Sequence, residues 1–199
     1  DGRALYCVAA LAVMLEAETG AQTFYEAHDD DICCVGVHKG GRYVATGQIA
    51  SAFSGTSPWL SVWDPATGRE LSRIGWVVDE RDGSERAGSA RGGGVASAAA
   101  ASNSVPASEL PVTARPPADA VSSTRLSYRP FYSRSICAVD FSPDGALLIA
   151  VGTDDQHTIG VWDWRRRQLL VAAPALQARP PGIHQLAVAP AAEGATSIF

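Results

Sequence analysis

The sequence has little charge, a single lysine and no long apolar run. Of its 199 residues 19% are charged, against roughly a quarter in an average soluble domain. The net charge of -5 argues against a nucleic-acid-binding protein, which needs a concentrated basic face. No apolar run reaches the roughly 18 residues that span a bilayer. We therefore predict no nucleic-acid partner and no membrane segment.

The cysteines lack the spacing of a metal or redox site. Cys7, Cys33, Cys34 and Cys137 lie in apolar, strand-like runs, and no pair forms Cys-x-x-Cys. Cys33 and Cys34 are adjacent, so they point to opposite faces of a strand and are poor disulfide partners. We interpret all of them as buried or half-buried reduced thiols of an intracellular protein. Neither a metal nor a cofactor is predicted.

The chain changes character in its middle. Residues 76–130 contain a Gly run at 92–94 and an Ala run at 98–101, with Ser, Pro and Arg around them and few aromatic residues. Such a segment buries too little apolar surface to offset the entropy lost on ordering. We predict a long, mostly disordered insert between folded flanks. The chain also opens at Asp1 without an initiator Met or a signal pattern, so it is expected to be an internal piece of a longer protein.

The flanks carry an internal repeat of roughly 40 residues. Val62-Trp63-Asp64 matches Val161-Trp162-Asp163, and residues 43–47 match residues 148–152. Short apolar runs bounded by Gly, Pro and Asp predict antiparallel strands in each repeat. These strands are expected at 32–37, 42–47, 59–64 and 69–74, and again at 135–141, 146–152, 158–163 and 168–173. Repeats of this kind that end in Trp-Asp are typical of β-propeller blades.

Both repeats resemble WD repeats of a β-propeller. In that family a buried hydrogen-bond chain joins a His before the first strand, a Ser or Thr on the second, an Asp before the third and a Trp on the third. In the first repeat His28, Thr46 and Trp63 match, while a longer loop at residues 48–58 replaces the Asp turn. The Asp of the Trp-Asp pair, Asp64, is included in this expected structural network.

The second repeat matches the WD pattern less completely. Asp155 (or Asp154) and Trp162 match, and Asp163 completes the Trp-Asp pair. Val151 stands at the Ser position, and no matching His precedes Ser135. The network is therefore expected to be partial in the first repeat and broken in the second, with stability resting on strand pairing and apolar packing.

Three strings resemble one family more closely, the echinoderm microtubule-associated protein-like proteins. They are residues 28–33, residues 37–48 with their Ala-Thr-Gly-Gln ending, and residues 154–164 with the double aromatic Trp162-Asp163-Trp164. The resemblance covers everything but the insert. It implies an all-β fragment of a WD-repeat propeller with four-stranded blades. The implied parts are the closing strands of a preceding blade at 1–27, blades at 28–75 and 131–174, the insert at 76–130, and the start of a following blade at 175–199.

The resemblance implies a cytoskeletal function. We expect a non-enzymatic scaffold that binds tubulin, microtubules and cytoskeletal proteins, in the cytoplasm on microtubules or in cilia. The alternative is a generic WD adaptor for signalling or ubiquitin-ligase assemblies without tubulin contact. No small-molecule substrate is predicted.

The polar clusters favour structural roles over chemistry. His28 precedes three aspartates, but consecutive residues cannot all face one ion. His157 lies beside Asp154 and Asp155 in a strand-connecting turn, where Asp side chains usually accept backbone N–H donors. No Gly-x-Ser-x-Gly elbow is present, so no catalytic residue is assigned. The basic run Arg165-Arg166-Arg167 is either a solvated hairpin turn or a contact for an acidic partner such as the tubulin surface.

Overall fold

The computed structural model describes residues 2–51, 55–79, 105–106, 127–175, 182–183 and 185–189. Within these ranges the chain forms strands and turns but no helix, and hence no helical segment that could span a bilayer. The chain divides into two compact units, one of residues 1–75 with 132–199 and one of residues 76–131. Each unit is described by itself.

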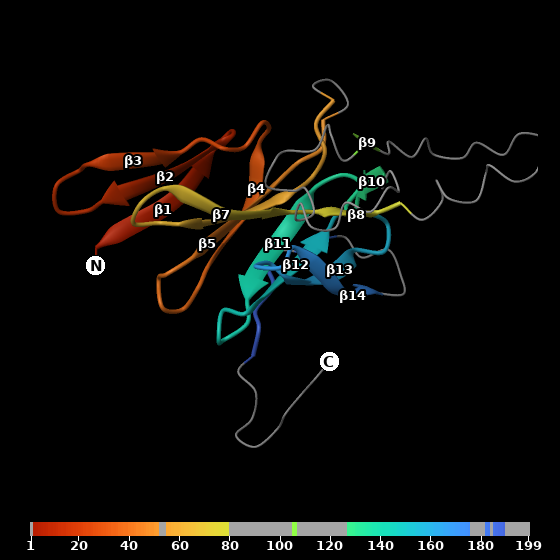
Figure 1. Ribbon diagram of the computed structural model, residues 1–199. Coiled ribbons are helices and arrows are strands. Elements are labelled where there is room, and N and C mark those ends of the chain that lie inside the picture. Colours follow the sequence, from red (N-terminus) through yellow and green to blue (C-terminus); the bar gives the residue numbers. More distant parts are fainter. Residues whose placement is uncertain are drawn as a thin grey trace, which may run out of the picture. The chain divides into compact units, whose positions relative to one another are not determined.

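The larger unit contains three antiparallel sheets (Figure 1). The first pairs β1 (Arg3–Val8), β2 (Leu11–Glu16) and β3 (Gln22–Tyr25). The second is β4 (Ile32–Val37), β5 (Val44–Gln48), β6 (Leu60–Asp64) and β7 (Arg69–Ile74). The third is β11 (Ile136–Phe141), β12 (Leu147–Gly152), β13 (Thr158–Asp163) and β14 (Gln168–Pro174). In the two four-stranded sheets the strands pair in chain order, as successive hairpins do.

The turns between strands follow from their residues. In Pro65-Ala66-Thr67-Gly68, Gly68 adopts a φ of 67°, a left-handed conformation that costs Gly least. The Gly68 N–H donates to the Asp64 carbonyl over 2.8 Å. The predicted tight turn between the third and fourth strands is therefore present, and it sets the register of the hairpin.

Both four-stranded sheets share the same irregularities. The first strand pair shifts register between Ile32 and Cys34 in one sheet and between Ile136 and Ala138 in the other. Cys33 and Cys137 therefore occupy equivalent bulges. A second shift separates Val62 from Trp63, and Val161 from Trp162. Matching bulges show that the sequence repeat is a structural repeat.

The pairing register corrects the alignment of the two repeats by one residue. Val44 pairs with Trp63, and Leu148 pairs with Trp162. Thr46 lies two residues after Val44, and Ala150 lies two residues after Leu148, so Thr46 and Ala150 occupy equivalent positions in the two sheets. The prediction that Val151 stands at the Ser position is therefore wrong by one residue, because it aligned the two Gly-ended strings and not the strand pairs.

The two four-stranded sheets pack against each other through their first strands, β4 and β11. At Gly36 an added Cβ would lie 2.6 Å from the Val139 carbonyl oxygen, so the two backbones touch there. Further out, the Ser72 hydroxyl of β7 donates to the backbone carbonyl of Trp164. Most buried side chains are apolar, and the largest fully buried ones include Trp59, Trp63 and Trp162. Aromatic burial on this scale is worth roughly 2 to 3 kcal/mol per side chain before entropy is counted.

The smaller unit contains a sheet of short strands. Its order is β8 (Trp76–Val78), β10 (Ser127–Pro130) and β9 (Val105–Pro106), all antiparallel. The ends of the predicted insert therefore pair as strands. The rest of the insert, residues 80–104 and 107–126, lies outside the described residues, and its disorder stays a prediction.

Only a few residues after Ala175 are described. Among them the Val188 N–H donates to Asp140 Oδ2 of β11 over 2.8 Å. No strand is assigned in residues 182–183 or 185–189. The predicted start of a following blade therefore stays a prediction.

Candidate functional site

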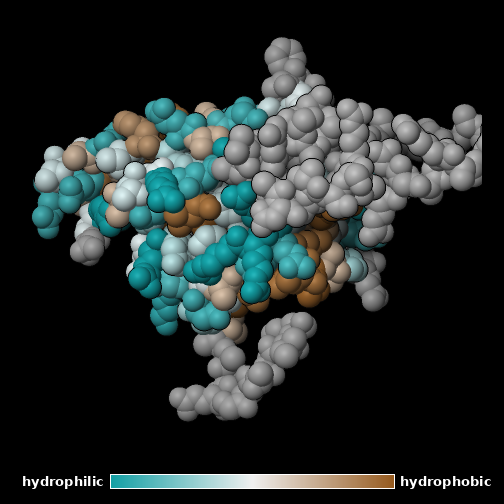
Figure 2. Space-filling model, in the orientation of Figure 1, coloured by the Kyte–Doolittle hydropathy of each residue, from teal (hydrophilic) through white to brown (hydrophobic). Residues whose placement is uncertain are grey.

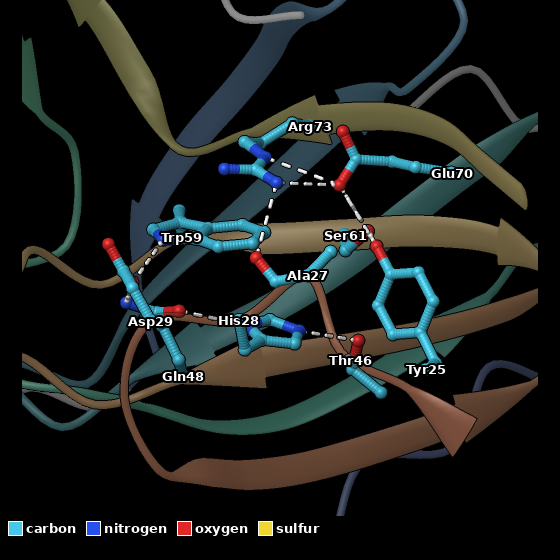
Figure 3. A network of polar contacts seen from close by, with 10 residues as sticks. All are labelled: Tyr25, Ala27, His28, Asp29, Thr46, Gln48, Trp59, Ser61, Glu70 and Arg73. Carbon is cyan, nitrogen blue, oxygen red and sulfur yellow. Dashed lines mark hydrogen bonds and ion pairs between the residues drawn. The ribbon is translucent and has the colours of Figure 1, made fainter. Parts of the chain in front are cut away.

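A buried polar network lies in the first four-stranded sheet, with His28 at its centre (Figure 3). His28 precedes β4 and is 6% exposed. Its Nε2 is 2.7 Å from Thr46 Oγ1, and its Nδ1 is 2.8 Å from Gln48 Oε1. Gln48 Nε2 in turn donates to the Asp29 carboxylate and to the Ser57 carbonyl. This hydrogen bonding fixes the segment before β4 onto β5.

Trp59 covers the imidazole of His28. The two rings stack with centroids 4.3 Å apart, and the Trp59 Nε1 donates to Asp29 Oδ1 over 3.2 Å. On the other side of Trp59, the Arg73 guanidinium carbon lies 3.9 Å from the ring centroid. A cation on an aromatic face is attracted by the ring quadrupole, so His28, Trp59 and Arg73 form one stack (Figure 3).

The network continues across the boundary with the preceding sheet. Tyr25 of β3 shares a hydrogen bond with the Ser61 hydroxyl and donates to Glu70 Oε2 over 2.9 Å. Glu70 forms an ion pair with Arg73, also at 2.9 Å. Arg73 also donates to the Ala27 carbonyl. One connected set of polar groups thus joins β3, β6 and β7.

Trp63 does not take its predicted place in the hydrogen-bond chain. Its Nε1 is buried and has no partner among the described residues. The indole instead stacks on Tyr25 with centroids 4.5 Å apart and planes 3° from parallel. The expectation for Trp63 is corrected: this side chain contributes apolar packing between two sheets.

Gln48 is a network residue that the sequence reasoning missed. Its amide oxygen lies within hydrogen-bond distance of His28 Nδ1. The WD pattern has an Asp in the turn before the third strand, whereas the longer loop at residues 48–58 contains no Asp or Glu. The available signal was the polar residue directly after Thr46-Gly47 at the end of a buried strand.

Burial determines the protonation states of the network. Desolvation lowers the pKa of His28 to about 4, against a smaller opposing effect of the Gln48 hydrogen bond. His28 is therefore neutral at pH 7. Burial is also the main cause that raises the pKa of Tyr25. A neutral imidazole and a protonated phenol suit hydrogen bonding within the fold.

The four-stranded sheet of β11 to β14 has a smaller polar cluster centred on Tyr132. The Trp162 Nε1 donates to Tyr132 Oη over 3.1 Å, and the Tyr132 hydroxyl lies 3.2 Å from the Ala150 carbonyl, to which it donates. Tyr132 precedes Ile136 by four residues, as His28 precedes Ile32. Tyr132 thus occupies the His position, and the network expected to be broken has a Trp donor with a different acceptor.

The larger Tyr132, at the position of His28, is accompanied by a smaller neighbour, Gly152. Gln48 is equivalent in register to Gly152. A Cβ at Gly152 would lie 2.8 Å from the Tyr132 ring. The larger phenol therefore fits because its neighbour has no side chain. The equal spacing before the first strands was the signal that could have found Tyr132.

The hydroxyl of Tyr132 gives the first testable prediction. Tyr132→Phe removes a buried acceptor of Trp162 while keeping the ring, and a lost buried hydrogen bond of this kind costs about 2 kcal/mol. Urea unfolding should show a lower midpoint with an unchanged slope. Tyr128→Phe, in the smaller unit, serves as the matched control. Equal stability of Tyr132→Phe and the wild type would contradict the role of this hydroxyl.

Asp154 and Asp155 have separate roles. Asp154 accepts hydrogen bonds from the Gln156 N–H and from both the N–H and the hydroxyl of Thr158. It is therefore the Asp of the turn before the third strand. Asp155, the first choice from sequence, instead forms an exposed ion pair with Arg134 at 2.9 Å. The assignment of Asp155 to a buried network is corrected in favour of Asp154.

The aspartates of the two Trp-Asp pairs cap turns. Asp64 accepts the Ala66 N–H over 2.8 Å and the Thr67 hydroxyl over 3.0 Å, and the first of these bonds is the main cause that lowers the Asp64 pKa. Asp163 accepts the Arg166 N–H over 3.0 Å. Both carboxylates therefore stabilise the turn after the third strand and lie outside the buried hydrogen-bond chain.

The basic run lies in the β13–β14 turn. Arg165 and Arg166 are exposed and Arg167 is partly exposed. Arg166 pairs with Asp163 at 3.2 Å. Arg165 stacks on Trp164, with its guanidinium carbon 4.1 Å from the ring centroid. The three arginines therefore present positive charge at one end of the sheet.

The thiols are unpaired, and Cys7, Cys34 and Cys137 are half-buried as predicted, whereas Cys33 is exposed. Partial desolvation is the main cause that raises the pKa of each thiol. Cys33, Cys34 and Cys137 border the same cavity, which β4 and β11 line together with residues 185–187. Among the described residues, no group of His, Cys, Asp and Glu has an arrangement that could hold a metal ion.

Comparison with known proteins agrees with this architecture. Residues 21–64 and 127–163 match the WD40 family, described as WD domain, G-beta repeat. The four-stranded antiparallel sheets are therefore blades of a WD-repeat β-propeller, as the sequence predicted.

The chain is similar to echinoderm microtubule-associated protein-like proteins, which confirms the resemblance drawn from the sequence. It is 25% identical over 175 residues to echinoderm microtubule-associated protein-like 2 of Rattus norvegicus, covering 85% of this chain and 19% of that protein. It is 26% identical over 178 residues to echinoderm microtubule-associated protein-like 1 of Homo sapiens, covering 85% of this chain and 15% of that protein. The 77 kDa echinoderm microtubule-associated protein of Strongylocentrotus purpuratus is 26% identical over 172 residues, covering 85% and 17%. The chain spans about a fifth or less of the length of these proteins.

Proposed function

We propose that this chain is part of a non-enzymatic, microtubule-associated scaffold of the cytoskeleton that binds tubulin. The observation that carries the proposal is the similarity across 85% of the chain to proteins named for microtubule association. Because the similar stretch includes both WD blades, the blades themselves are the natural candidates for the contact.

The geometry supports a scaffold. The titratable groups of the network serve the fold: His28 is buried and neutral, and Glu70 is paired with Arg73. Asp154 caps a turn. The turns at the two ends of the blades offer further side chains to a partner, because a rigid framework positions loop residues for binding.

Charge complementarity favours the end that carries the basic run. The chain as a whole is acidic, so attraction to an acidic protein such as tubulin has to come from a local basic surface. Arg165, Arg166 and Arg167 supply such a surface at the β13–β14 turn. We assign these residues to the partner contact.

Co-sedimentation with polymerised microtubules tests the proposal. The chain should pellet saturably with microtubules at low ionic strength, and binding should weaken as salt is added, because exposed charge pairs are screened. Absence of binding at low salt would overturn the proposal. It would then favour the generic WD adaptor, which assembles other protein complexes without tubulin contact.

A further inference from the structure

The charge of the larger unit is divided between the two ends of its sheets. In a four-stranded antiparallel sheet the first and third turns lie at one end and the second turn at the other. Near the second turns, and at the segments before the first strands, the chain places Asp29, Asp30, Asp31, Asp154 and Asp155. The first and third turns carry the basic residues Lys39, Arg42, Arg165, Arg166 and Arg167. An acidic protein thus presents one basic end.

Two basic turns from neighbouring blades meet there. Arg165, from the β13–β14 turn, donates through Nη2 to the Tyr43 hydroxyl over 3.3 Å, and Tyr43 ends the β4–β5 turn. Through Nη1 it donates to the Gly145 carbonyl over 2.9 Å. The Trp164 Nε1 donates to that same carbonyl over 3.0 Å. The bond to Tyr43 joins the two basic turns, and the two bonds to Gly145 fix the β13–β14 turn to the β11–β12 turn of the same sheet.

A cluster of aromatic side chains packs beneath the basic residues of this end. Tyr43 and Trp164 meet edge to face with centroids 5.1 Å apart, and Tyr43 lies 6.3 Å from Phe141. His38 packs against Phe141 at 5.9 Å and against Tyr43 at 5.6 Å. Because Trp164 and Phe141 are buried, this aromatic cluster is rigid. It fixes where the exposed basic side chains emerge.

The carboxylates at this end are engaged in turns. Asp144 accepts the Ser142 hydroxyl and the Ala146 N–H, and these bonds hold its pKa below the usual value. Asp163 caps the β13–β14 turn. Basic side chains outnumber carboxylates at this junction. Glu16 and Glu18 lie further along, where they border a cavity with Pro65 and Ala66 of the β6–β7 turn. Among the described turns, basic side chains therefore gather at the junction of the two four-stranded sheets, and the exposed Arg69 follows the β6–β7 turn.

We propose that this junction surface, formed by Lys39 and Arg42 of one blade and Arg165, Arg166 and Arg167 of the next, binds a glutamate-rich acidic peptide segment of a partner protein. The proposal rests on the proposed scaffold function and adds the partner's chemistry and the second blade's contribution. Exposed Lys39, Arg42, Arg165 and Arg166 offer multiple donors to carboxylates, and Arg forms bidentate pairs with them.

A peptide fits this surface better than a nucleic acid does. In Figure 2 the coloured surface is largely hydrophilic, with smaller hydrophobic areas. The surface also contains the fixed negative charges of Asp144 and Asp163. A phosphate backbone would pass close to these carboxylates and to an otherwise acidic protein, which opposes counterion-driven binding. A short peptide can place its carboxylates against the basic side chains and away from Asp144 and Asp163.

Fluorescence polarisation with a labelled octapeptide of glutamate tests the proposal. The full chain should bind the peptide saturably at low salt. The double variant K39E/R42E and the single variant R166E should each weaken binding by roughly tenfold, because each reverses charge on one side of a shared site. Arg134→Glu, at the acidic end, is the matched control and should leave the affinity within about twofold.

Each other outcome overturns the proposal. If R166E weakens binding but K39E/R42E does not, the two blades do not share one site. If an octamer of single-stranded thymidine binds more tightly than the glutamate peptide, the surface selects phosphate. Urea midpoints measured for every variant exclude loss of folding as the cause. Peptide binding without microtubule co-sedimentation would overturn only the tubulin assignment, so the two failures are distinguishable.

Discussion

Replacing Gly36 with alanine is expected to destabilise the larger unit by about 3 kcal/mol, since overpacking a tight core contact costs roughly this much. Gly36 lies on β4, where β11 of the next blade approaches it. An added Cβ would lie 2.6 Å from the Val139 carbonyl oxygen and 3.3 Å from Val139 Cγ1. The nearer neighbour is backbone, which cannot rotate away, so the two sheets would have to separate. Urea unfolding measures the effect.

Gly2→Ala is the control for Gly36→Ala. The added methyl group would meet Ala17 Cβ at 3.6 Å, an ordinary contact, so stability should stay within about 0.5 kcal/mol of wild type. A Gly36→Ala protein as stable as the Gly2→Ala protein would mean that β4 and β11 do not pack as closely as described.

The second large effect is a loss of stability on acidification that depends on His28. Its pKa in the folded protein is about 4 because burial disfavours the charged ring, whereas an unfolded histidine titrates near 6.5. The unfolded chain therefore binds a proton more readily, and stability falls as pH drops below about 6.5. Between pH 7.5 and pH 5 the loss should be about 2 kcal/mol. Above pH 7 His28 is neutral in both the folded and the unfolded protein, so the stability is not reduced by its protonation.

Unfolding free energies of His28→Gln at the two pH values isolate this effect. The variant cannot titrate at position 28, so its pH dependence should be smaller than that of wild type by about 2 kcal/mol. His157→Asn is the matched control, because φ at that turn residue is 49°, a value that Asn tolerates. It should retain the wild-type loss, since His28 is intact. Identical pH dependence of wild type and His28→Gln would contradict a buried neutral His28.

The repeat and its strands could be predicted from the sequence because their signals are local. Alternating apolar residues, the turn Pro65-Ala66-Thr67-Gly68 and the Trp-Asp pairs each lie within a few residues of the strand they define. The WD resemblance then supplied the order of strands. His28 beside Thr46 followed from the same pattern, and the structure places these two side chains 2.7 Å apart.

The remaining parts of the network could not be predicted, because they depend on the pairing register of the strands and on residues that replace those of the WD pattern. The predicted second strands end in Gly47 and Gly152, and aligning these glycines matches Val151 in place of Ala150, whereas the strand pairing makes Gly152 equivalent to Gln48. Gln48 and Tyr132 take over WD positions with residue types that the family pattern does not specify. Tyr132 fits only beside Gly152, a neighbour that is distant in sequence. The contact of Arg165 with Tyr43 joins residues of two blades, so it required the packing itself.

Microtubule co-sedimentation of the wild-type chain beside its Gly36→Ala variant tests most directly whether packed WD blades form the binding scaffold. The wild-type chain is expected to pellet saturably with microtubules at low salt. Gly36→Ala, in which β4 and β11 are forced apart, is expected to pellet much less. A wild-type chain that stays in the supernatant at every microtubule concentration, or a variant that binds as tightly as wild type, would contradict it.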